Sequence, residues 1–154
     1  CNMGRMADLR VDGRPVGAAI AERLRAESEA AAQAEKGSII VLLVTDAPLD
    51  ARQLRRIATR AGAGIVRTGS HLGSGSGDIA LAVSTAEPIP HAPPKGKMLT
   101  RRVLHEDVLD RFFRAAIEAT EEAILNALLA AEPRTGRQGR TRRSLGEFVD
   151  LVRG

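Results

Sequence analysis

The chain has 154 residues, which is enough for one ordinary domain with a core of its own. Aromatic residues make up only 2%, with three Phe and neither Tyr nor Trp, so this chain alone offers few rings for stacking on nucleic-acid bases. The net charge of +4 comes largely from a short arginine-rich stretch near residue 140 that is typical of solvated surface, and nucleic-acid binding is the weakest of the functions we considered. The single cysteine excludes an internal disulfide framework, and the longest apolar run is too short to span a bilayer.

The first 36 residues predict a turn followed by a helix. "DLRVDGRPVG" alternates apolar and polar residues around Asp12-Gly13, a turn dipeptide, and this indicates a strand, a tight turn and a short extended return. Residues 18–36 are rich in Ala, Glu and Arg and favour a helix, but no apolar stripe continues past Leu24. We expect this segment to be an exposed helix or a linker. "CNMG" does not resemble a natural start, so we also expect the chain to be part of a longer protein.

The middle of the chain predicts a strand, a helix and a second strand. The unbroken apolar run Ile39–Val44 fits a strand that is buried on both faces. Asp50 is placed to cap the next helix. Apolar residues then recur at helical spacing, at Leu54, Ile57, Ala58, Ala61 and Ile65. After the loop "TGSHLGSGSG", the stretch "DIALAVST" predicts a second strand with large apolar residues on one face and alanines on the other.

The last third predicts a loop and a long helix. "AEPIPHAPPKGK" is rich in proline and indicates a surface loop. Apolar residues at helical spacing then predict a helix over residues 106–131, ended by Pro133 and Gly136. "SLGEFVDLVRG" predicts a final short helix or strand. The alternation of strands and helices indicates an α/β or α+β layered fold.

Two features that often carry chemistry give little support for it here. The Gly-rich loop follows a helix and precedes a strand, and no Lys-Ser/Thr pair follows it. This order favours a flexible connection over a nucleotide-binding loop. His71, His91 and His105 lack the spacing of metal ligands, and no cysteine lies near them. We therefore expect no bound metal.

Ser38 directly follows Gly37 and directly precedes the first buried strand. A serine hydroxyl is a weak nucleophile unless a base accepts its proton. An N-terminal serine carries such a base in its own α-amine, whose unperturbed pKa is about 7.7–8.0 and which usually acts through one water. The amine exists only after the preceding bond is cut, so this chemistry needs a small residue before the serine, a rigid strand after it and a loose segment ahead. "AEKGSIIVLLV" has these parts, although Gly-Ser before a strand is also a common turn ending.

Longer stretches around Ser38 resemble a known family. "GSIIVLLVTDAPLDARQLRRIATRAGAGIVRTGS" and "GSGDIALAVST" are similar to the L-aminopeptidase/D-esterase family, the DmpA-type N-terminal-nucleophile hydrolases that include the β-peptidyl aminopeptidases. "LRVDGRPVG" and "AIEATEEAILNALLAAEPRTGRQGR" resemble the same family, so the similarity extends over residues 2–140.

The resemblance implies an α+β fold, the four-layer αββα sandwich of DmpA and ornithine acetyltransferase, of which this chain would be the C-terminal part. It implies a precursor that cuts itself between Gly37 and Ser38. Residues 1–37 would then be the tail of the α subunit with a linker, and residues 38–154 the β subunit that carries the nucleophile.

The resemblance also implies the site residues. Ser38 would be the nucleophile, and Ser76 and Asp78 of "SGD" would orient and tune it. Relatives carry Glu at the acid position, so Asp78 keeps the charge on a side chain that is shorter by one methylene. "CNMG" matches the family's Asn-x-Gly segment, which makes Asn2 the candidate oxyanion donor.

The implied activity is release of N-terminal amino acids from short peptides, amides or esters, without a cofactor. The implied partners are the remainder of the α subunit, further αβ units of a homo-oligomer and a small substrate, with neither nucleic acid nor membrane. The lack of disulfides fits the cytoplasm. Two alternatives stay open: an inactive fragment or interaction domain without most of the α subunit, and an ornithine-acetyltransferase-like acyltransferase, whose usual nucleophile is Thr rather than Ser.

Overall fold

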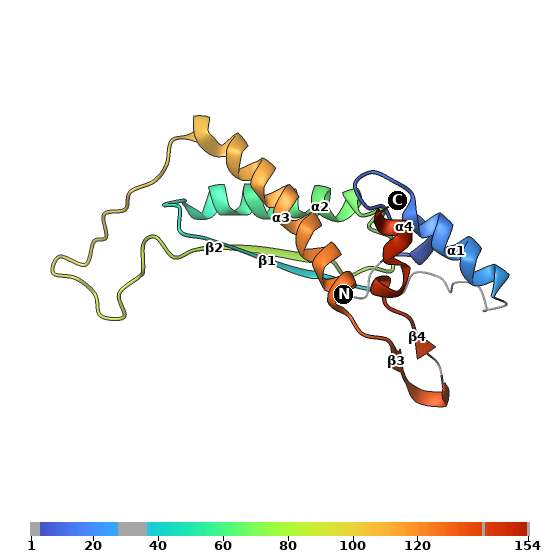
Figure 1. Ribbon diagram of the computed structural model, residues 1–154. Coiled ribbons are helices and arrows are strands. Elements are labelled where there is room, and N and C mark those ends of the chain that lie inside the picture. Colours follow the sequence, from blue (N-terminus) through green and yellow to red (C-terminus); the bar gives the residue numbers. More distant parts are fainter. Residues whose placement is uncertain (1–3, 28–36, 140, 154) are drawn as a thin grey trace.

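The computed structural model describes residues 4–27, 37–139 and 141–153 (Figure 1). The helices are α1 (Val16–Ala26), α2 (Ala51–Arg67), α3 (Leu109–Ala130) and α4 (Val149–Arg153). The strands are β1 (Ile40–Thr45), β2 (Ile79–Ser84), β3 (Arg134–Thr135) and β4 (Thr141–Arg142). Short 3₁₀ turns are η1 (Met6–Asp8), η2 (Glu106–Val108), η3 (Arg137–Gly139) and η4 (Leu145–Phe148).

The centre of the molecule is a β1–α2–β2 unit. The two strands are parallel and pair in register, with Ile40 opposite Ile79 and Thr45 opposite Ser84. A parallel pair needs a crossover connection, and α2 provides it. This helix begins with the predicted Asp50 cap, whose side chain accepts from the Gln53 amide at 2.7 Å while the Gln53 side chain accepts from the Asp50 amide at 3.1 Å.

The two strands are covered on one face and exposed on the other. The prediction that residues 39–44 are buried on both faces is therefore wrong for the described part of the chain. The inner side chains, such as Leu43, pack towards α2 and its neighbours. The outer side chains are large, apolar and exposed, and we call them the outer sheet face: Ile40, Leu42, Val44, Ile79, Leu81 and Val83. The predicted division of the second strand into a large-residue face and an alanine face is confirmed.

The helix α3 packs along α2 and closes the main core. Leu49, Ile57, Leu109, Phe113 and Ala116 form this core, and Leu43 of β1 packs against it. Close approach of the two helices depends on Gly64, because a Cβ atom there would lie 2.6 Å from the Ile117 carbonyl oxygen and 2.7 Å from the Thr120 Cβ. The predicted helix over residues 106–131 is confirmed as η2 followed directly by α3.

A second apolar cluster joins the two ends of the chain. Val16 and Ile20 of α1 pack with Leu145 and Phe148 of η4, with further apolar residues of α3 and α4 around them. Ahead of α1, Val11 and Arg14 exchange backbone hydrogen bonds of 3.1 and 3.0 Å around the predicted turn, but only this bridge forms in place of the predicted strand and return. The final residues are helical, which decides between the two predicted possibilities.

Two segments extend from this body. Residues 85–105 contain neither helix nor strand and include the predicted loop of residues 86–97, and Figure 1 shows this segment reaching well away from the helices. The arginine-rich stretch contains the short antiparallel pair β3–β4, which was not predicted. In the part of the chain that the structure describes, no helix is long and apolar enough to cross a membrane.

Candidate functional site

The site lies where β1 and β2 begin. Because the strands are parallel and Ile40 pairs with Ile79, their first residues lie side by side. The Ile79 amide donates to the Ile39 carbonyl at 2.9 Å, so the pairing continues one residue beyond the strands. Extending the same register places Ser38 beside Gly77, at the end of the Gly-rich loop. Residues almost forty positions apart are thus brought together by sheet pairing.

Ser76 contacts the residue that precedes the candidate nucleophile. Its hydroxyl lies 2.9 Å from the Gly37 carbonyl oxygen and 2.6 Å from Asp78 Oδ1. A hydroxyl has one proton to donate, so the two acceptors share or alternate in receiving it. A turn closed by the Ser76 amide and the Gly73 carbonyl at 2.9 Å holds Ser76 in this place.

Asp78 links the loop to the start of β1. Its Oδ1 atom accepts from the Ser76 hydroxyl and, at 3.3 Å, from the Ile39 amide. The shorter aspartate side chain therefore reaches the second serine despite lacking the methylene of glutamate. The carboxylate is half-buried and adjoins the residue after Ser38, where it can orient hydroxyl groups and attract a positive charge.

Ser38 is exposed, whereas Gly37 before it is buried. The Ser38 Oγ atom accepts from the Gly77 amide at 3.0 Å. The structure thus brings together three of the predicted site residues, Ser38, Ser76 and Asp78. The fourth, Asn2, lies outside the described residues and stays a prediction. Sequence reasoning missed the Gly77 amide, because no side chain marks a backbone donor and only the strand register reveals it.

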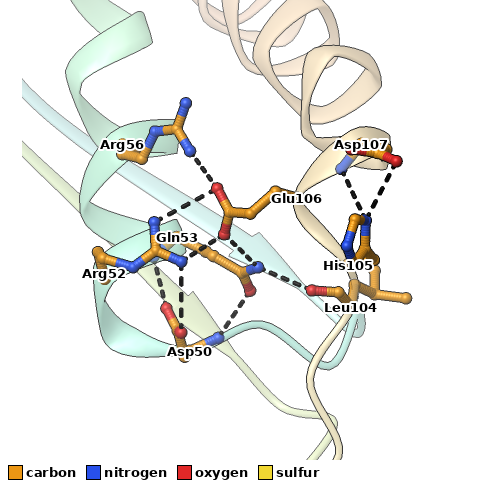
Figure 2. Close-up of polar contacts among 8 residues, drawn as sticks. All are labelled: Asp50, Arg52, Gln53, Arg56, Leu104, His105, Glu106 and Asp107. Carbon is orange, nitrogen blue, oxygen red and sulfur yellow. Dashed lines mark hydrogen bonds and ion pairs between the residues drawn. The ribbon is translucent and has the colours of Figure 1, made fainter.

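Polar residues also gather at the opposite end of the strand pair, in the group that we call the Glu106 cluster: Asp50, Arg52, Gln53, Arg56 and Glu106 (Figure 2). The Glu106 carboxylate pairs with both arginines and accepts from Gln53 Nε2 at 3.0 Å. The same Gln53 amide group donates to the Leu104 carbonyl at 2.8 Å, and the Gln53 side chain is buried.

The Glu106 cluster holds structure together rather than presenting a reactive group. Hydrogen bonds from Arg52 and then Gln53, together with the charges of Arg52 and Arg56, lower the pKa of Glu106 to about 2, against a smaller opposing effect of burial. In Figure 2, the interactions of the Glu106 carboxylate all go to side chains of α2, those of Arg52, Gln53 and Arg56. The cluster therefore joins the start of α2 to the segment that leads into α3.

Among residues 4–27, 37–139 and 141–153, no group of three or more His, Cys, Asp and Glu side chains is close enough to hold a metal ion. His105 instead accepts from the Asp107 amide through Nδ1 at 3.4 Å, at the start of η2.

Comparison with known proteins gives consistent matches. Residues 1–142 match peptidase family S58. The chain is 41% identical over 150 residues to the β-peptidyl aminopeptidase BapA of Sphingosinicella microcystinivorans, a match that covers 92% of this chain and 38% of that protein.

Solved structures agree with this match. The PH0078 protein of Pyrococcus horikoshii OT3 is 40% identical with a TM-score of 0.81, over 97% of this chain and 39% of that one. The L-aminopeptidase D-Ala-esterase/amidase of Ochrobactrum anthropi, a variant of the Ntn-hydrolase fold, is 34% identical with a TM-score of 0.77, over 99% and 41%. The α+β fold class and the DmpA-type family are confirmed, and the chain spans less than half the length of each of these three proteins.

Proposed function

Because the chain belongs to peptidase family S58, we propose that it is the C-terminal part of a self-processing aminopeptidase whose nucleophile is Ser38. The observation that carries this proposal is the position of two successive loop residues. The Ser76 hydroxyl contacts the Gly37 carbonyl oxygen, and the Gly77 amide contacts Ser38 Oγ. Both sides of the Gly37–Ser38 peptide bond are therefore held by the same short loop.

Self-cleavage begins with attack of Ser38 Oγ on the Gly37 carbonyl carbon. The C–N bond breaks, the Oγ proton ends on the Ser38 nitrogen, and Gly37 becomes an ester of Ser38. Water then hydrolyses the ester to a Gly37 carboxylic acid, which loses its proton to solvent, and a free Ser38 hydroxyl. The Ser76 hydroxyl is placed to donate to the Gly37 oxygen as negative charge develops on it, which is the contribution expected of an oxyanion donor.

Substrate hydrolysis uses the same atoms. The new Ser38 α-amine accepts the Oγ proton, Oγ attacks an N-terminal aminoacyl amide or ester, and the amine returns the proton to the leaving group. Asp78 positions Ser76 and the first residue of β1 through its two hydrogen bonds. Water finally releases the amino acid. Asn2 is the proposed second oxyanion donor.

We assign residues 1–37 to the α subunit and residues 38–154 to the β subunit. The proposed partner of the outer sheet face is the remainder of the α subunit, because exposed apolar faces of this kind mark association sites. Leu42→Asp should prevent the subunits from staying together in gel filtration of the full-length protein. The control Val66→Asp changes an apolar residue of α2 with a similar exposed fraction, 49% against 59%, and should leave them together. Equal behaviour of both variants would contradict this assignment.

We also propose that several αβ units assemble and that the protein is cytoplasmic, as its single cysteine permits. The loop of residues 85–105 supports assembly, because Ile89, Met98 and Leu99 are exposed on it. Light scattering of the full-length protein should give a mass of more than one αβ unit, and a mass of one unit would contradict the assembly.

The function is tested with the full-length protein and a set of α- and β-aminoacyl nitroanilides. We expect hydrolysis and a serine-reactive sulfonyl fluoride adduct on the peptide that begins at Ser38. Ser38→Ala should lower kcat by at least about 10³-fold. The control Ser74→Ala removes an exposed hydroxyl of the same loop and should keep the activity. Full activity of Ser38→Ala, or an adduct elsewhere, would contradict the proposal.

A further inference from the structure

The hydrogen bond between Gly77 and Ser38 is formed by the backbone of the loop, not by a side chain. The Gly77 amide donates to Ser38 Oγ at 3.0 Å. The position of this amide follows from the strand register, because Ile40 pairs with Ile79 and the ladder continues to Ile39. Because this donor belongs to the backbone, no side-chain rotamer has to change before it donates to Ser38 Oγ.

Gly77 is the donor and Ser38 Oγ the acceptor of this hydrogen bond, and this direction determines at which step of the reaction the bond is strongest. An amide N–H can only donate, so it occupies one of the two lone pairs of Oγ and leaves the other for attack. A hydrogen bond becomes shorter and stronger when its acceptor carries negative charge. The bond should therefore stabilise Ser38 most when Oγ resembles an alkoxide.

Oγ carries this charge when an ester of Ser38 breaks. Water adds to the acyl carbon, the C–Oγ bond then breaks, and its electron pair goes to Oγ. The proton lost by water reaches Oγ through the base, so the products are a carboxylic acid and the Ser38 hydroxyl. This step occurs twice in the proposed scheme, once with the Gly37 ester during self-cleavage and once with the aminoacyl ester of the substrate.

We propose that Gly77 is a further catalytic residue, whose backbone amide stabilises Ser38 Oγ as the leaving group of both esters. This inference rests on the proposed function of Ser38. A Cβ atom at residue 77 would lie 3.4 Å from Ser38 Oγ, which is an ordinary van der Waals contact, and the backbone of Gly77 does not have the positive φ that would require glycine. Alanine at this position therefore keeps the amide donor in place.

Two substitutions at Gly77 distinguish the effect of losing the amide donor from the effect of filling the space beside it. Gly77→Pro removes the donor, and Gly77→Ala keeps the donor and adds the methyl group. Ser74→Pro is the matched control, because Ser74 is exposed and occupies the second position of the Gly73–Ser76 turn, where proline is favoured. Full-length precursor is purified for each variant, and cleavage before Ser38 is followed by intact mass, with and without hydroxylamine, which splits esters.

Gly77→Pro should slow cleavage on the order of 10²-fold and accumulate uncut chain that hydroxylamine splits at once before Ser38. Gly77→Ala and Ser74→Pro should cleave within a few-fold of the original protein. A purely structural role for Gly77 would instead leave uncut chain that resists hydroxylamine. Uncut chain that resists hydroxylamine, or cleavage of Gly77→Pro at the original rate, would overturn the inference about Gly77. An original protein that never cleaves would instead overturn the proposed function.

If Gly77→Pro does not fold, as judged by its circular dichroism and unfolding temperature, an amide-to-ester replacement of the Ser76–Gly77 bond takes its place. This replacement removes the N–H with almost no change of shape. Accumulation of the hydroxylamine-sensitive ester supports the role of the amide, and cleavage at the original rate contradicts it.

Discussion

The two ends of the parallel pair β1–β2 both carry polar residues, but they use them differently. At the carboxyl ends, Glu106 is paired with two arginines and with the buried Gln53, so its capacity to accept hydrogen bonds is used to join α2 to η2. At the amino ends, Ser38 is exposed, and it lies beside a loop that contacts it through small groups.

On the proposed function, the difference teaches that a dense group of polar residues and a shifted pKa do not by themselves identify a reactive site. The pKa of Glu106 is lowered to about 2, and parallel sheets usually bind ligands beyond their carboxyl ends, so both indications favour the end of this pair opposite to the proposed nucleophile. The amino end has the arrangement that the proposed chemistry needs, because a second hydroxyl contacts the Gly37 carbonyl and a backbone amide contacts the hydroxyl of the candidate nucleophile Ser38. Variants at the two ends should therefore change different properties.

After replacement of Ser38 itself, the largest effect on chemistry is expected at Asp78. Asp78→Asn keeps an oxygen acceptor but removes the charge that strengthens the 2.6 Å bond from Ser76. The rates of self-cleavage and of nitroanilide hydrolysis should fall about 10²-fold, with little change in the unfolding temperature. Asp46→Asn, at an exposed aspartate just after β1, is the control and should leave both rates unchanged. Equal rates for Asp78→Asn and the original protein would remove Asp78 from the site.

An intermediate effect, on stability alone, is expected where α2 crosses α3 between the two ends. Gly64→Ala places a Cβ atom 2.6 Å from the Ile117 carbonyl oxygen, so the helices must separate, at a cost of about 1–3 kcal/mol in the free energy of unfolding. Gly62→Ala is the matched control on the same helix, because its Cβ meets only Leu72 Cδ1 at 3.9 Å. Urea unfolding should separate the two variants, and equal loss of stability would show that the close helix contact is not what Gly64 provides.

The smallest effect is expected in the Glu106 cluster, and it should depend on pH. The pKa of Glu106 is lower in the folded protein, so its charge stabilises the fold above about pH 4.5, and this contribution is lost as the pH falls towards 2. Glu106→Gln should lower the urea midpoint at pH 7 without changing kcat, and the difference from the original protein should shrink towards pH 2.

Asp107→Asn is the control for this prediction, because the Asp107 side chain is 86% exposed and its ion pair is with His105. Its urea midpoint should be close to that of the original protein at both pH values. A difference between Glu106→Gln and the original protein that stays constant from pH 7 to pH 2 would exclude the charge of Glu106 as the cause.

Much of the fold could be predicted from the sequence because its signals are local. The Asp50 cap, the helical spacing in α2 and the proline-rich loop each depend on a few neighbouring residues, and all three are confirmed. The exposure of the outer sheet face could not be predicted, because a run such as residues 39–44 has the same composition whether one or both faces are covered by this chain.

The site was predictable in part. Ser38, Ser76 and Asp78 came from the resemblance to a family, and the spacing of the residues alone would not have joined them. Their contacts depend on the register of β1 and β2, a long-range property that the local sequence does not specify. The Gly77 amide was missed for the same reason, since a backbone donor is identified only when its acceptor is placed beside it.

The central claim is that Ser38 becomes a nucleophile at its own peptide bond, and the mass of the full-length protein tests it most directly. Intact-mass analysis of freshly purified protein should show two polypeptides, the smaller beginning "SIIVLL" at Ser38, and Ser38→Ala should yield one uncut chain. A single uncut chain in the original protein that nevertheless hydrolyses aminoacyl amides, or cleavage at another bond, would contradict the account.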